Sequence, residues 1–451
     1  MSTIHDPLHL PCGARLSNRL AKAAVTEGLA DERGWPTADL VRLYEGWSDA
    51  GFALLISGNV IVDGAHLERP GNIVIDHTLS DPGHLQALQG WTQAATRGGA
   101  HFWAQLSHSG RQTPKSVNAR PLSVSDVRMG LPKALFGEPR AMKDVEIHDV
   151  VENFAAAAAT CKAAGFTGVQ IHAAHGYLLG TFLAPKVNNR ADKWGGSLAN
   201  RARLLLDVVA GVRARVGRMF PVSVKLNSAD FQRGGFEARD CLVVGKWLEA
   251  AGVDLLEISG GSYENPVMLG ASGAGADCEP RRKASTVERE AYFLDFARTM
   301  RQELKMPIML TGGLRSRQGM QAALDEGVDV LGIARPACVD QQCGKALLAG
   351  QIDRFESWEA NLRREKGLFS PNSPIPLLGV LANFAGIFWF YAQINRLAKG
   401  TAPSLRLSPL RGLIEIMLAD RANLARRGRW LKDRAPIGEA TPKGVSRKKA
   451  A

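Results

Sequence analysis

The chain has 451 residues, of which 45% are hydrophobic, and a formal net charge of +12. This length exceeds one average domain, and the apolar fraction is sufficient for a large buried core. The six cysteines lack paired or metal-ligand spacing, which argues against a disulfide framework and favours reduced thiols in a cytoplasm. The N-terminus has no charged segment followed by an apolar one, so we expect no signal peptide.

The positive charge is concentrated at the C-terminal end of the chain. From Arg421 onward there are ten Lys/Arg against two Asp/Glu, which leaves +4 for the first 420 residues. Basic ends can contact anionic lipid or nucleic acid, but most are simply solvated. Because no aromatic residues are interleaved with the basic ones in the manner of a nucleic-acid platform, we expect no nucleic-acid partner.

Short apolar runs alternate with helical patterns from residue 19 to about residue 350. The expected strands are Leu20–Val25, Ala53–Ser57, Ala100–Gln105, Gly168–Ile171, Val222–Leu226, Leu255–Ile258, Ile308–Leu310 and Val330–Ile333. The expected helices are Leu40–Trp47, Leu85–Ala95, Val150–Ala164, Ala202–Val212, Asp240–Ala251, Glu288–Leu304 and Gly319–Leu324. Eight strand–helix units in succession predict an α/β fold in which a parallel sheet closes into a (β/α)8 TIM barrel.

A doubly wound open sheet is the alternative architecture. It requires a Gly-x-Gly-x-x-Gly loop after the first strand, and the residues Lys22–Thr26 there do not match that pattern. The sequence therefore favours the barrel. The proline-containing segment from Arg111 to Lys143 is long for a connection, and long ordered loops in barrels often cover the active site.

Two histidines and a tyrosine follow the fourth expected strand, in the order His172-Ala-Ala-His175-Gly-Tyr177. Two imidazoles at a strand end can bind an electron-rich oxygen, and a nearby phenol can supply a proton, which suits reduction of a polarised double bond. A metal site is a weaker alternative, since no cysteine or carboxylate lies close by in the sequence. Two histidines packed in a loop are the third interpretation.

Several motifs together resemble the old yellow enzyme family of flavin-dependent ene-reductases over about residues 5 to 365. They are Asn18-Arg19-Leu20, Gln105-Leu-Ser-His108-Ser-Gly-Arg111, the His172–Tyr177 segment and Thr311-Gly312-Gly313. The resemblance implies a TIM barrel that holds non-covalent FMN and transfers hydride from NADH or NADPH to an electron-poor alkene such as an enone. Which nicotinamide serves is left open.

The resemblance also assigns roles at the carboxyl ends of the strands. His172 and His175 would bind the substrate oxygen, and Tyr177 would be the proton donor. The side chain of Gln105 would bind the polar edge of the flavin, and Lys225 would place a positive charge near its N1 and C2 carbonyl. The cofactor-binding residues implied are Ala23, Ala24, Val25, Thr26, Gly58, Gln105, Lys225, Gly312, Gly313, Ala334 and Arg335, with the last four at the phosphate.

Two positions depart from the family pattern. Lys225 stands where the family has Arg, so the charge is kept but the bidentate guanidinium is lost. Gly28 stands where many relatives have an aromatic residue just beyond the Thr/Cys position, which leaves one wall of the substrate pocket without an assigned residue. No metal is expected, since the region after Arg335 has only two cysteines and lacks the iron–sulfur segment of the larger relatives.

The residues after the barrel form an extension of a different character. Residues Ile375–Ile394 are uncharged over a length that could span a bilayer, but their large side chains fall on one stripe, which favours docking on protein. We therefore expect an FMN-binding domain over 1–367, a helical extension over 368–436 and a disordered basic tail over 437–451. We expect a cytoplasmic location. Two questions stay open: whether residues 375–434 contact a membrane surface, and whether the protein forms a homo-oligomer. The alternative functions are a flavin-dependent dehydrogenase or demethylase, or a membrane-associated flavoprotein scaffold.

Overall fold

The computed structural model describes residues 2–79, 81–230, 234–259, 296–362, 370 and 373–433. Eight parallel strands form a closed barrel, because β3 pairs with β4 on one side and with β13 on the other. The barrel strands are β3 (Leu20–Lys22), β4 (Leu54–Ile61), β6 (His101–Ser107), β9 (Gly168–Ala173), β10 (Val222–Asn227), β11 (Leu255–Ser259), β12 (Ile308–Thr311) and β13 (Val330–Ile333). The predicted TIM barrel is thus confirmed, and each strand overlaps its expected range.

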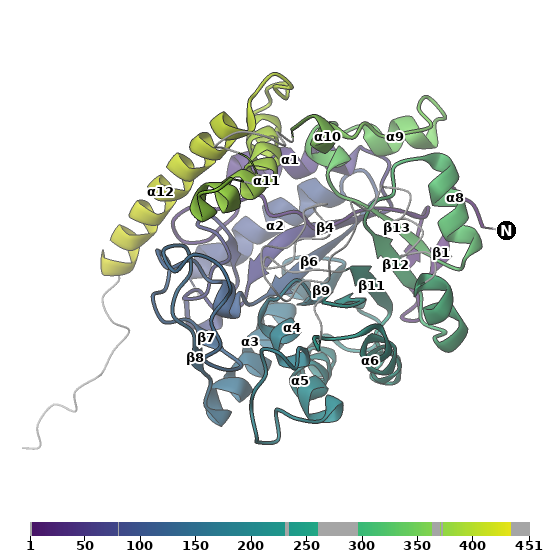
Figure 1. Ribbon diagram of the computed structural model, residues 1–451. Helices are drawn as coiled ribbons and strands as arrows, with labels where there is room; N and C mark the ends of the chain where they lie inside the picture. The colour runs from purple at the N-terminus through teal and green to yellow at the C-terminus, as the bar shows by residue number, and fades with distance from the viewer. Residues whose placement is uncertain are drawn as a thin grey trace, which may run out of the picture.

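Helices surround this barrel on its outer side (Figure 1). They are α1 (Ala38–Ser48), α2 (Pro82–Thr96), α3 (Asp144–Ala163), α4 (Leu178–Leu183), α5 (Leu198–Val216), α6 (Ala238–Ala250), α8 (Arg317–Asp325), α9 (Cys343–Leu348) and α10 (Trp358–Leu362). Several begin two to four residues before the expected range, since a polar N-cap such as Thr37 or Ser197 accepts a backbone N–H of the first turn. Of the helix expected at Glu288–Leu304, residues 288–295 lie outside the described residues, and residues 296–303 are helical.

Shorter elements complete the domain. They are β1 (Leu8–His9), β2 (Arg15–Leu16), β5 (Ile73–Val74), β7 (Leu122–Ser123), β8 (Arg140–Ala141), and the 3-10 helices at His77–Leu79, Gly110–Gln112 and Pro336–Cys338. The antiparallel pair β1–β2 contributes Leu8 and Leu16 to an apolar cluster with Trp103 and Met309 from the barrel interior. Apolar side chains therefore fill one part of the barrel interior, and polar ones are left for the other.

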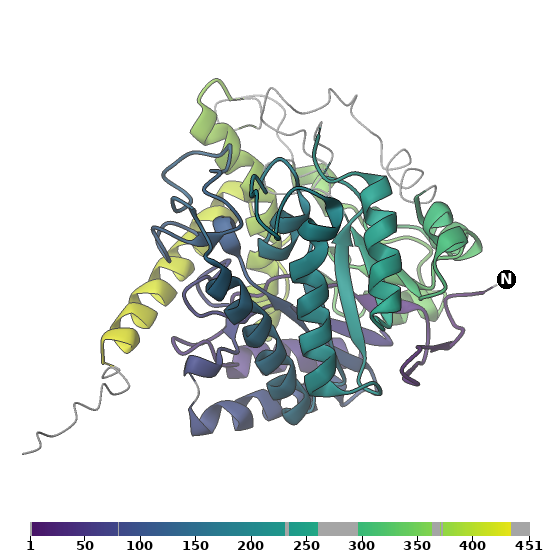
Figure 2. The same cartoon turned by 90° about the horizontal axis from the view of Figure 1, so that it is seen from below.

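The C-terminal extension consists of α11 (Pro376–Ala398) and α12 (Pro409–Asp433). Helix α11 packs on α1 and α12 packs on α11, and Trp389 belongs to the same buried cluster as the outer barrel core. The indole N–H of Trp389 donates to Leu407 O at 2.8 Å, and Arg42 of α1 donates to Ala398 O at 2.6 Å. This is the docked arrangement favoured by the sequence, and Figure 2 shows α12 running past one side of the barrel.

Both expected faces of α11 contain buried residues. Ile394 of the large-residue stripe is buried and Phe388 packs against the outer core, while Gly379 and Gln393 of the small-residue face are buried as well. Small and polar residues on this side let the helix axes approach, and Gln393 is held by hydrogen bonds to the backbone of Ser404. Among the described helices none is long and apolar enough to cross a membrane.

Candidate active site

Strand register brings five polar side chains together inside the barrel. Gln105 of β6 pairs with Gln170 of β9, while Lys225 of β10 pairs with His172 of β9 on one side and Glu257 of β11 on the other. All five residues are buried. Because residues paired in register on parallel strands point to the same face, the predicted residues Gln105, His172 and Lys225 lie on one polar interior surface.

A buried hydrogen-bonded chain links two of the predicted residues. The Nε2 of Gln105 donates to Oε1 of Gln170 (2.6 Å), and Nε2 of Gln170 donates to Oε2 of Glu257 (2.8 Å). The other oxygen of Glu257 lies 2.9 Å from Nζ of Lys225. A carboxylate only accepts, so it fixes the orientation of both amides and turns the Oε1 of Gln105 away from Gln170. Gln105 can therefore present an acceptor to a ligand.

His172 and His175 lie next to each other, with ring centres 5.1 Å apart and planes at 82°. Burial, with a further contribution from the Lys225 cation, holds the pKa of both imidazoles well below its usual value. Both are thus neutral at pH 7. The Nδ1 of His172 accepts the N–H of Ala174 at 3.2 Å, so its proton is on Nε2, which is a donor.

His175 adopts a left-handed backbone conformation, with φ of 60°. This costs free energy for a residue with a side chain, so the surroundings must enforce it. The His175 N–H donates to Oδ1 of Asn227 (3.1 Å), and its C=O accepts from Nε2 of Gln112 (2.9 Å). The ring Nε2 lies 2.8 Å from Oγ of Ser259. Strands β10 and β11 and the 3-10 helix at Gly110–Gln112 thus each hold the second histidine.

Tyr177 is buried beside the first histidine, its ring centre 4.7 Å from that of His172. Tyr177 is the N-cap residue of α4. The first residue of this helix, Leu178, donates its N–H to His108 O at 3.0 Å. Arg111 also anchors the long segment that follows it, donating to Arg128 O at 3.2 Å. The His108–Arg111 motif therefore braces the segment that carries Tyr177.

The residues after β3 lie beside the end of β13. Ala23 donates its N–H to Ile333 O at 2.9 Å, and Ala24 and Ala334 pack on the same interior cluster. Val25 contacts the outer core. The expected ring-lining segment from residue 23 and the expected phosphate residue Ala334 are therefore brought together.

Thr26 and Gly58 have partners that the sequence did not suggest. The hydroxyl of Thr26 donates to Oε2 of Glu68 at 2.8 Å, so its proton is directed there in this structure. The Gly58 N–H donates to Oε1 of Glu27 at 2.9 Å, and a Cβ at Gly58 would lie 2.2 Å from the Glu27 carboxylate. The close approach of Glu27 is thus the visible reason for the glycine.

Glycines and two guanidinium groups meet at the ends of β12 and β13. Gly312 and Gly313 have φ of 142° and 75°, which residues with side chains rarely adopt. Arg315 and Arg335 both contact the same oxygen of Glu359, at 2.6 and 3.0 Å. Burial raises the pKa of the Glu359 carboxyl, but the two arginines outweigh it, so the net pKa is lowered. Arg315 and Arg335 thus share one carboxylate oxygen of Glu359, close in the chain to Gly312 and Gly313.

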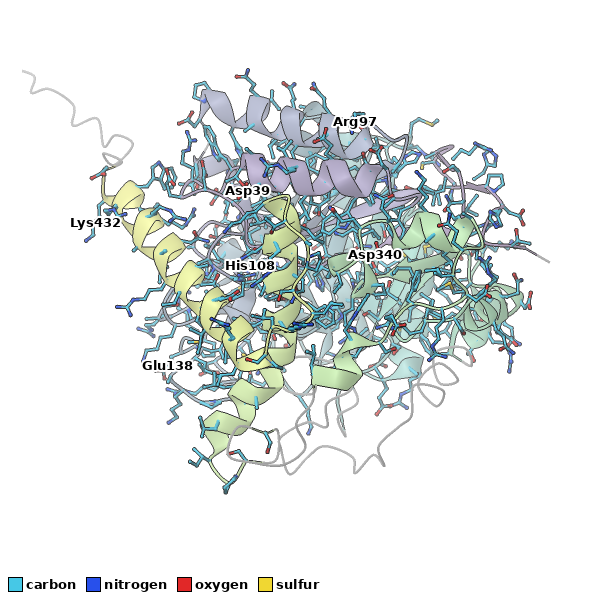
Figure 3. All side chains as sticks on the ribbon, turned by 90° about the horizontal axis from the view of Figure 1, so that it is seen from above. Asp39, Arg97, His108, Glu138, Asp340 and Lys432 are labelled. Carbon is cyan, nitrogen blue, oxygen red and sulfur yellow. The ribbon has the colours of Figure 1, made fainter. Side chains whose placement is uncertain are left out.

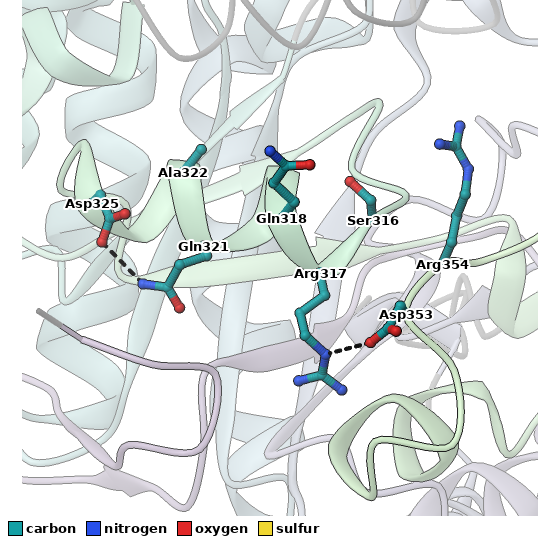
Figure 4. Close-up of a pocket in the computed structure, with 8 residues that line it drawn as sticks. All are labelled: Ser316, Arg317, Gln318, Gln321, Ala322, Asp325, Asp353 and Arg354. Carbon is teal, nitrogen blue, oxygen red and sulfur yellow. Dashed lines mark hydrogen bonds and ion pairs between the residues drawn. The ribbon is translucent and has the colours of Figure 1, made fainter.

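Two N–H groups in the first turn of α8 are engaged within the protein. Gly319 N–H donates to Ser316 Oγ (3.0 Å), and Arg317 N–H donates to Asp353 O (2.8 Å). A hollow of about 740 Å³ lies beside this helix. Figure 4 shows the residues that line it, with Arg317 paired to Asp353. This hollow is lined by none of the predicted site residues, so it is separate from the proposed chemistry.

Asp63, His66 and His108 have metal-ligand atoms close together, but their hydrogen bonds argue against a metal. His66 Nε2 accepts the N–H of Leu122 (2.9 Å), and His108 Nδ1 accepts the N–H of Gly110 (3.0 Å). A metal on the opposite nitrogens would require protons on these two, which cannot then accept. Both imidazoles instead direct protons at Asp63, and these bonds hold the pKa of its carboxyl far below normal against the effect of burial.

The sequence did not single out Gln170, Glu257, Glu68 or Arg315 as parts of the site. Gln170 and Glu257 are each a polar residue within an otherwise apolar strand. For Glu257 this can be seen in the sequence itself, in Leu255-Leu-Glu-Ile-Ser259. Glu68 lies in a loop after β4, where no periodicity marks it. A polar residue inside an otherwise apolar barrel strand is therefore the usable signal.

The residues present fit FMN. Buried hydroxyls of Ser107, Ser228 and Thr311 lie at or just beyond strand ends and have no hydrogen-bond partner among the described atoms. Such groups normally find partners, so a polar ligand at this end of the barrel suits them. Gln105 offers an acceptor to the imide edge, Lys225 a cation, and the glycines with Arg315 and Arg335 a phosphate site.

Residues 3–348 match the model of the NADH:flavin oxidoreductase / NADH oxidase family. A NADH-dependent flavin oxidoreductase, iliE, of Hypocrea jecorina (strain QM6a) is 36% identical over 368 residues, covering 77% of this chain and 90% of that protein. An iliE protein of Neonectria sp. (strain DH2) is 37% identical over 358 residues, covering 75% of this chain and 46% of that protein, so the chain spans about half its length. A third relative, iccE of Talaromyces variabilis, is 34% identical over 424 residues, covering 88% of this chain and 99% of that protein.

A solved structure of the old yellow enzyme homologue from Zymomonas mobilis is also similar, with a TM-score of 0.65, 25% identity, and coverage of 79% of this chain and 95% of that chain. Morphinone reductase, at 22% identity and a TM-score of 0.63, covers 79% of this chain and 92% of that chain and shows the same fold. The family match covers most of the chain and agrees with the site described above. The chain therefore belongs to the NADH:flavin oxidoreductase / NADH oxidase family of old yellow enzyme type and is an FMN-dependent NAD(P)H oxidoreductase.

Proposed function

We propose that this oxidoreductase reduces electron-poor alkenes, such as enones, whose carbonyl or nitro oxygen is bound by His172 and His175. The observation that carries this proposal is the adjacent pair of neutral imidazoles. His172 is buried and has its proton on Nε2, and His175 is half-buried beside it. A neutral donor in a buried site binds a developing negative oxygen without requiring a proton from solvent. Binding that oxygen withdraws electrons from the conjugated double bond and makes its β-carbon electrophilic.

The remaining residues would divide the work around this pair. FMN, when bound, would supply the hydride-transfer chemistry between the nicotinamide and the β-carbon of the alkene. Tyr177 Oη would supply the proton at the α-carbon, because its ring lies against His172 and is buried. Lys225, compensated by Glu257, keeps a positive charge beside the histidines, and Gln105 presents Oε1 to the flavin edge.

Phosphate binding would use the two arginines at the ends of β12 and β13. The FMN phosphate would share or replace the contacts that Glu359 makes with Arg315 and Arg335. Backbone close to Gly312, Gly313 and Ala334 would approach the phosphate, as the positive φ values of the two glycines permit. The backbone of Ala23, Ala24, Val25 and Thr26, with Gly58 behind Glu27, would line the ring.

The test is an anaerobic turnover assay with cyclohexenone and NADH or NADPH. We expect one cyclohexanone to form for each nicotinamide oxidised, with His172→Ala/His175→Ala strongly impaired. If the protein instead oxidises an N-methylated amine or another donor while cyclohexenone is unreactive, the dehydrogenase or demethylase alternative replaces this proposal. The FMN site would stand in either case.

A further inference from the structure

Helix α12 presents large apolar side chains to solvent. Leu410, Ile414, Met417 and Leu418 are 45, 50, 51 and 62% exposed, and their spacing places them on one face of the helix. We call these four residues the α12 apolar patch. The side of the helix that packs on the protein, which includes Leu413 and Ile416, is buried. A contiguous exposed patch of this kind on a folded domain marks a binding surface rather than a core.

Basic side chains adjoin the α12 apolar patch on the exposed side. They are Arg411, Arg421, Arg426, Arg429 and Lys432, all of which are exposed. Within the described residues none of the five forms an ion pair with a carboxylate. The acids of α12 are mostly engaged elsewhere, since Glu415 pairs with Arg396 (2.9 Å) and Asp420 with Arg69 (3.0 Å). The exposed face therefore combines an apolar patch with a strong positive charge.

The structure fixes the orientation of this face. Asp420 binds Arg69, whose guanidinium also lies 4.5 Å from the Tyr391 ring centre of α11. Arg427 donates to Glu32 O (3.2 Å) and Gly64 O (3.1 Å) on loops of the barrel. Figures 1 and 2 show the C-terminal end of α12 projecting from the barrel, and Lys432 lies at that end in Figure 3. The basic part of the helix thus reaches beyond the domain.

We propose that the exposed face of α12 binds the surface of an anionic phospholipid bilayer. The apolar patch would enter the boundary between headgroups and acyl chains, and the arginines would contact lipid phosphates. Residues after Asp433 add five Lys/Arg against one Asp/Glu, so they carry the same sign. A second copy of the chain would bring another cationic face to this one, whereas anionic lipid complements it.

The inference does not depend on the alkene chemistry, and its test uses the flavin-loaded full-length protein. Flotation with vesicles of phosphatidylcholine alone, or with 30% phosphatidylglycerol, measures binding at low and high salt. Arg421→Glu/Arg426→Glu/Arg429→Glu tests the charge, and Ile414→Ser/Leu418→Ser tests the patch. The matched control is Arg218→Glu/Lys305→Glu/Lys345→Glu, which makes the same change of net charge from +12 to +6 at exposed sites elsewhere.

We expect binding to the anionic vesicles only, weakened by salt, and reduced at least tenfold by the α12 charge variant. The Ser variant should lose binding severalfold, the control should bind like the original protein, and the flavin spectrum should be unchanged throughout. Absence of binding to anionic vesicles overturns the inference. So does equal loss in the control variant, or a stable dimer that the Ser variant dissociates, because a second copy would then cover the face.

Discussion

Two lysines are buried in the barrel wall, on opposite sides of it, and only one faces the proposed site. Lys22 of β3 points outward to α1, with Nζ 2.8 Å from Ile56 O and 4.3 Å from the ring centre of Trp47. Lys225 of β10 points inward, with Nζ 2.9 Å from Glu257. Among the described carboxylates none forms an ion pair with Lys22.

The two lysines differ in their partners rather than in their burial. Burial lowers the pKa of Lys22 to about 8, an effect that the more distant Glu27 offsets in part. The ammonium group of Lys22 contacts a backbone carbonyl and the aromatic rings of Tyr44 and Trp47. These contacts link β3 to α1. Lys225 is joined through Glu257 to a polar chain that ends at Gln105. The inward lysine thus belongs to a site.

Replacement of Lys225 by Met is the strongest test of this distinction. It leaves the fully buried carboxylate of Glu257 without its cation, which should lower the free energy of unfolding by about 3–5 kcal/mol. The measurement is urea unfolding of the flavin-free protein at pH 7. Adding Glu257→Gln should recover much of the loss.

The matched control for that experiment is a lysine on the surface. Lys246 pairs with Glu303 at 2.6 Å, but both side chains are about half exposed. Lys246→Met should therefore change stability by less than about 1 kcal/mol. If Lys246→Met and Lys225→Met lowered the free energy of unfolding equally, the buried pair of Lys225 and Glu257 would be no more important for stability than a surface ion pair.

The neighbouring histidines sharpen the comparison by showing whether the inward polar surface binds oxygen. His172→Ala should weaken binding of a phenol ligand to the FMN-loaded protein by about 1.5–3 kcal/mol, measured by flavin absorbance. Because both imidazoles are neutral well below pH 6.5, affinity in the original protein should be constant between pH 6.5 and 8.

A histidine outside the site provides the control. His9 of β1 is exposed, so His9→Ala should leave phenol binding unchanged. Affinity that rises steeply as the pH falls through 6.5 would contradict the neutral pair, since it would show an imidazole gaining a proton in the complex.

For the outward-facing Lys22, the prediction concerns how the free energy of unfolding depends on pH. A depressed pKa means that the unfolded chain holds the proton at higher pH than the folded one, so stability rises with pH between about 8 and 10.5. From pH 7.5 to 9.5 the original protein should gain about 2 kcal/mol relative to Lys22→Met, as measured by urea unfolding. Enzyme activity should be little affected. Parallel pH profiles for the two proteins would remove the basis for treating Lys22 as a buried cation.

The smallest predicted effect concerns the proposed phosphate site. There the carboxylate of Glu359 pairs with Arg315 and Arg335. Glu359→Gln should free Arg315 and Arg335 and tighten FMN binding by about 0.5–1 kcal/mol, since the contacts are partly exposed. Fluorescence titration of the flavin-free protein measures this. The control, Glu356→Gln, alters an exposed glutamate without an ion pair to any described residue and should leave the affinity unchanged.

The two lysines also explain which parts of the site the sequence could predict. The contexts Ala21-Lys22-Ala23 and Val224-Lys225-Leu226 look alike, and only the strand end and the family motif favoured Lys225. Barrel closure, by contrast, followed from eight strand–helix units whose periodicity is local. Glu257 could be noticed as a polar residue in an apolar strand, but its pairing with Lys225, like that of Glu68 with Thr26, could not be predicted, because each pair joins different segments of the chain.

The same limit applies to the C-terminal extension. The uncharged run from Ile375 indicated a helix, and the structure has α11 from Pro376 to Ala398. Trp389 and Gln393 are anchored by hydrogen bonds to the backbone beyond the helix, and hydropathy does not reveal such contacts. The proposed boundaries of the flavin domain at residue 367 and of the tail at 437 lie outside the described residues and stay predictions.

The most direct test of the proposed function is single-turnover reoxidation by cyclohexenone. The protein is reduced anaerobically with one equivalent of NADH and mixed with the enone while the flavin absorbance is followed. We predict rapid reoxidation by the original protein and a rate at least a hundredfold lower for His172→Ala/His175→Ala, with reduction by NADH and flavin content largely retained. Equal reoxidation rates in the two proteins would contradict the assignment of these histidines as the oxygen-binding pair.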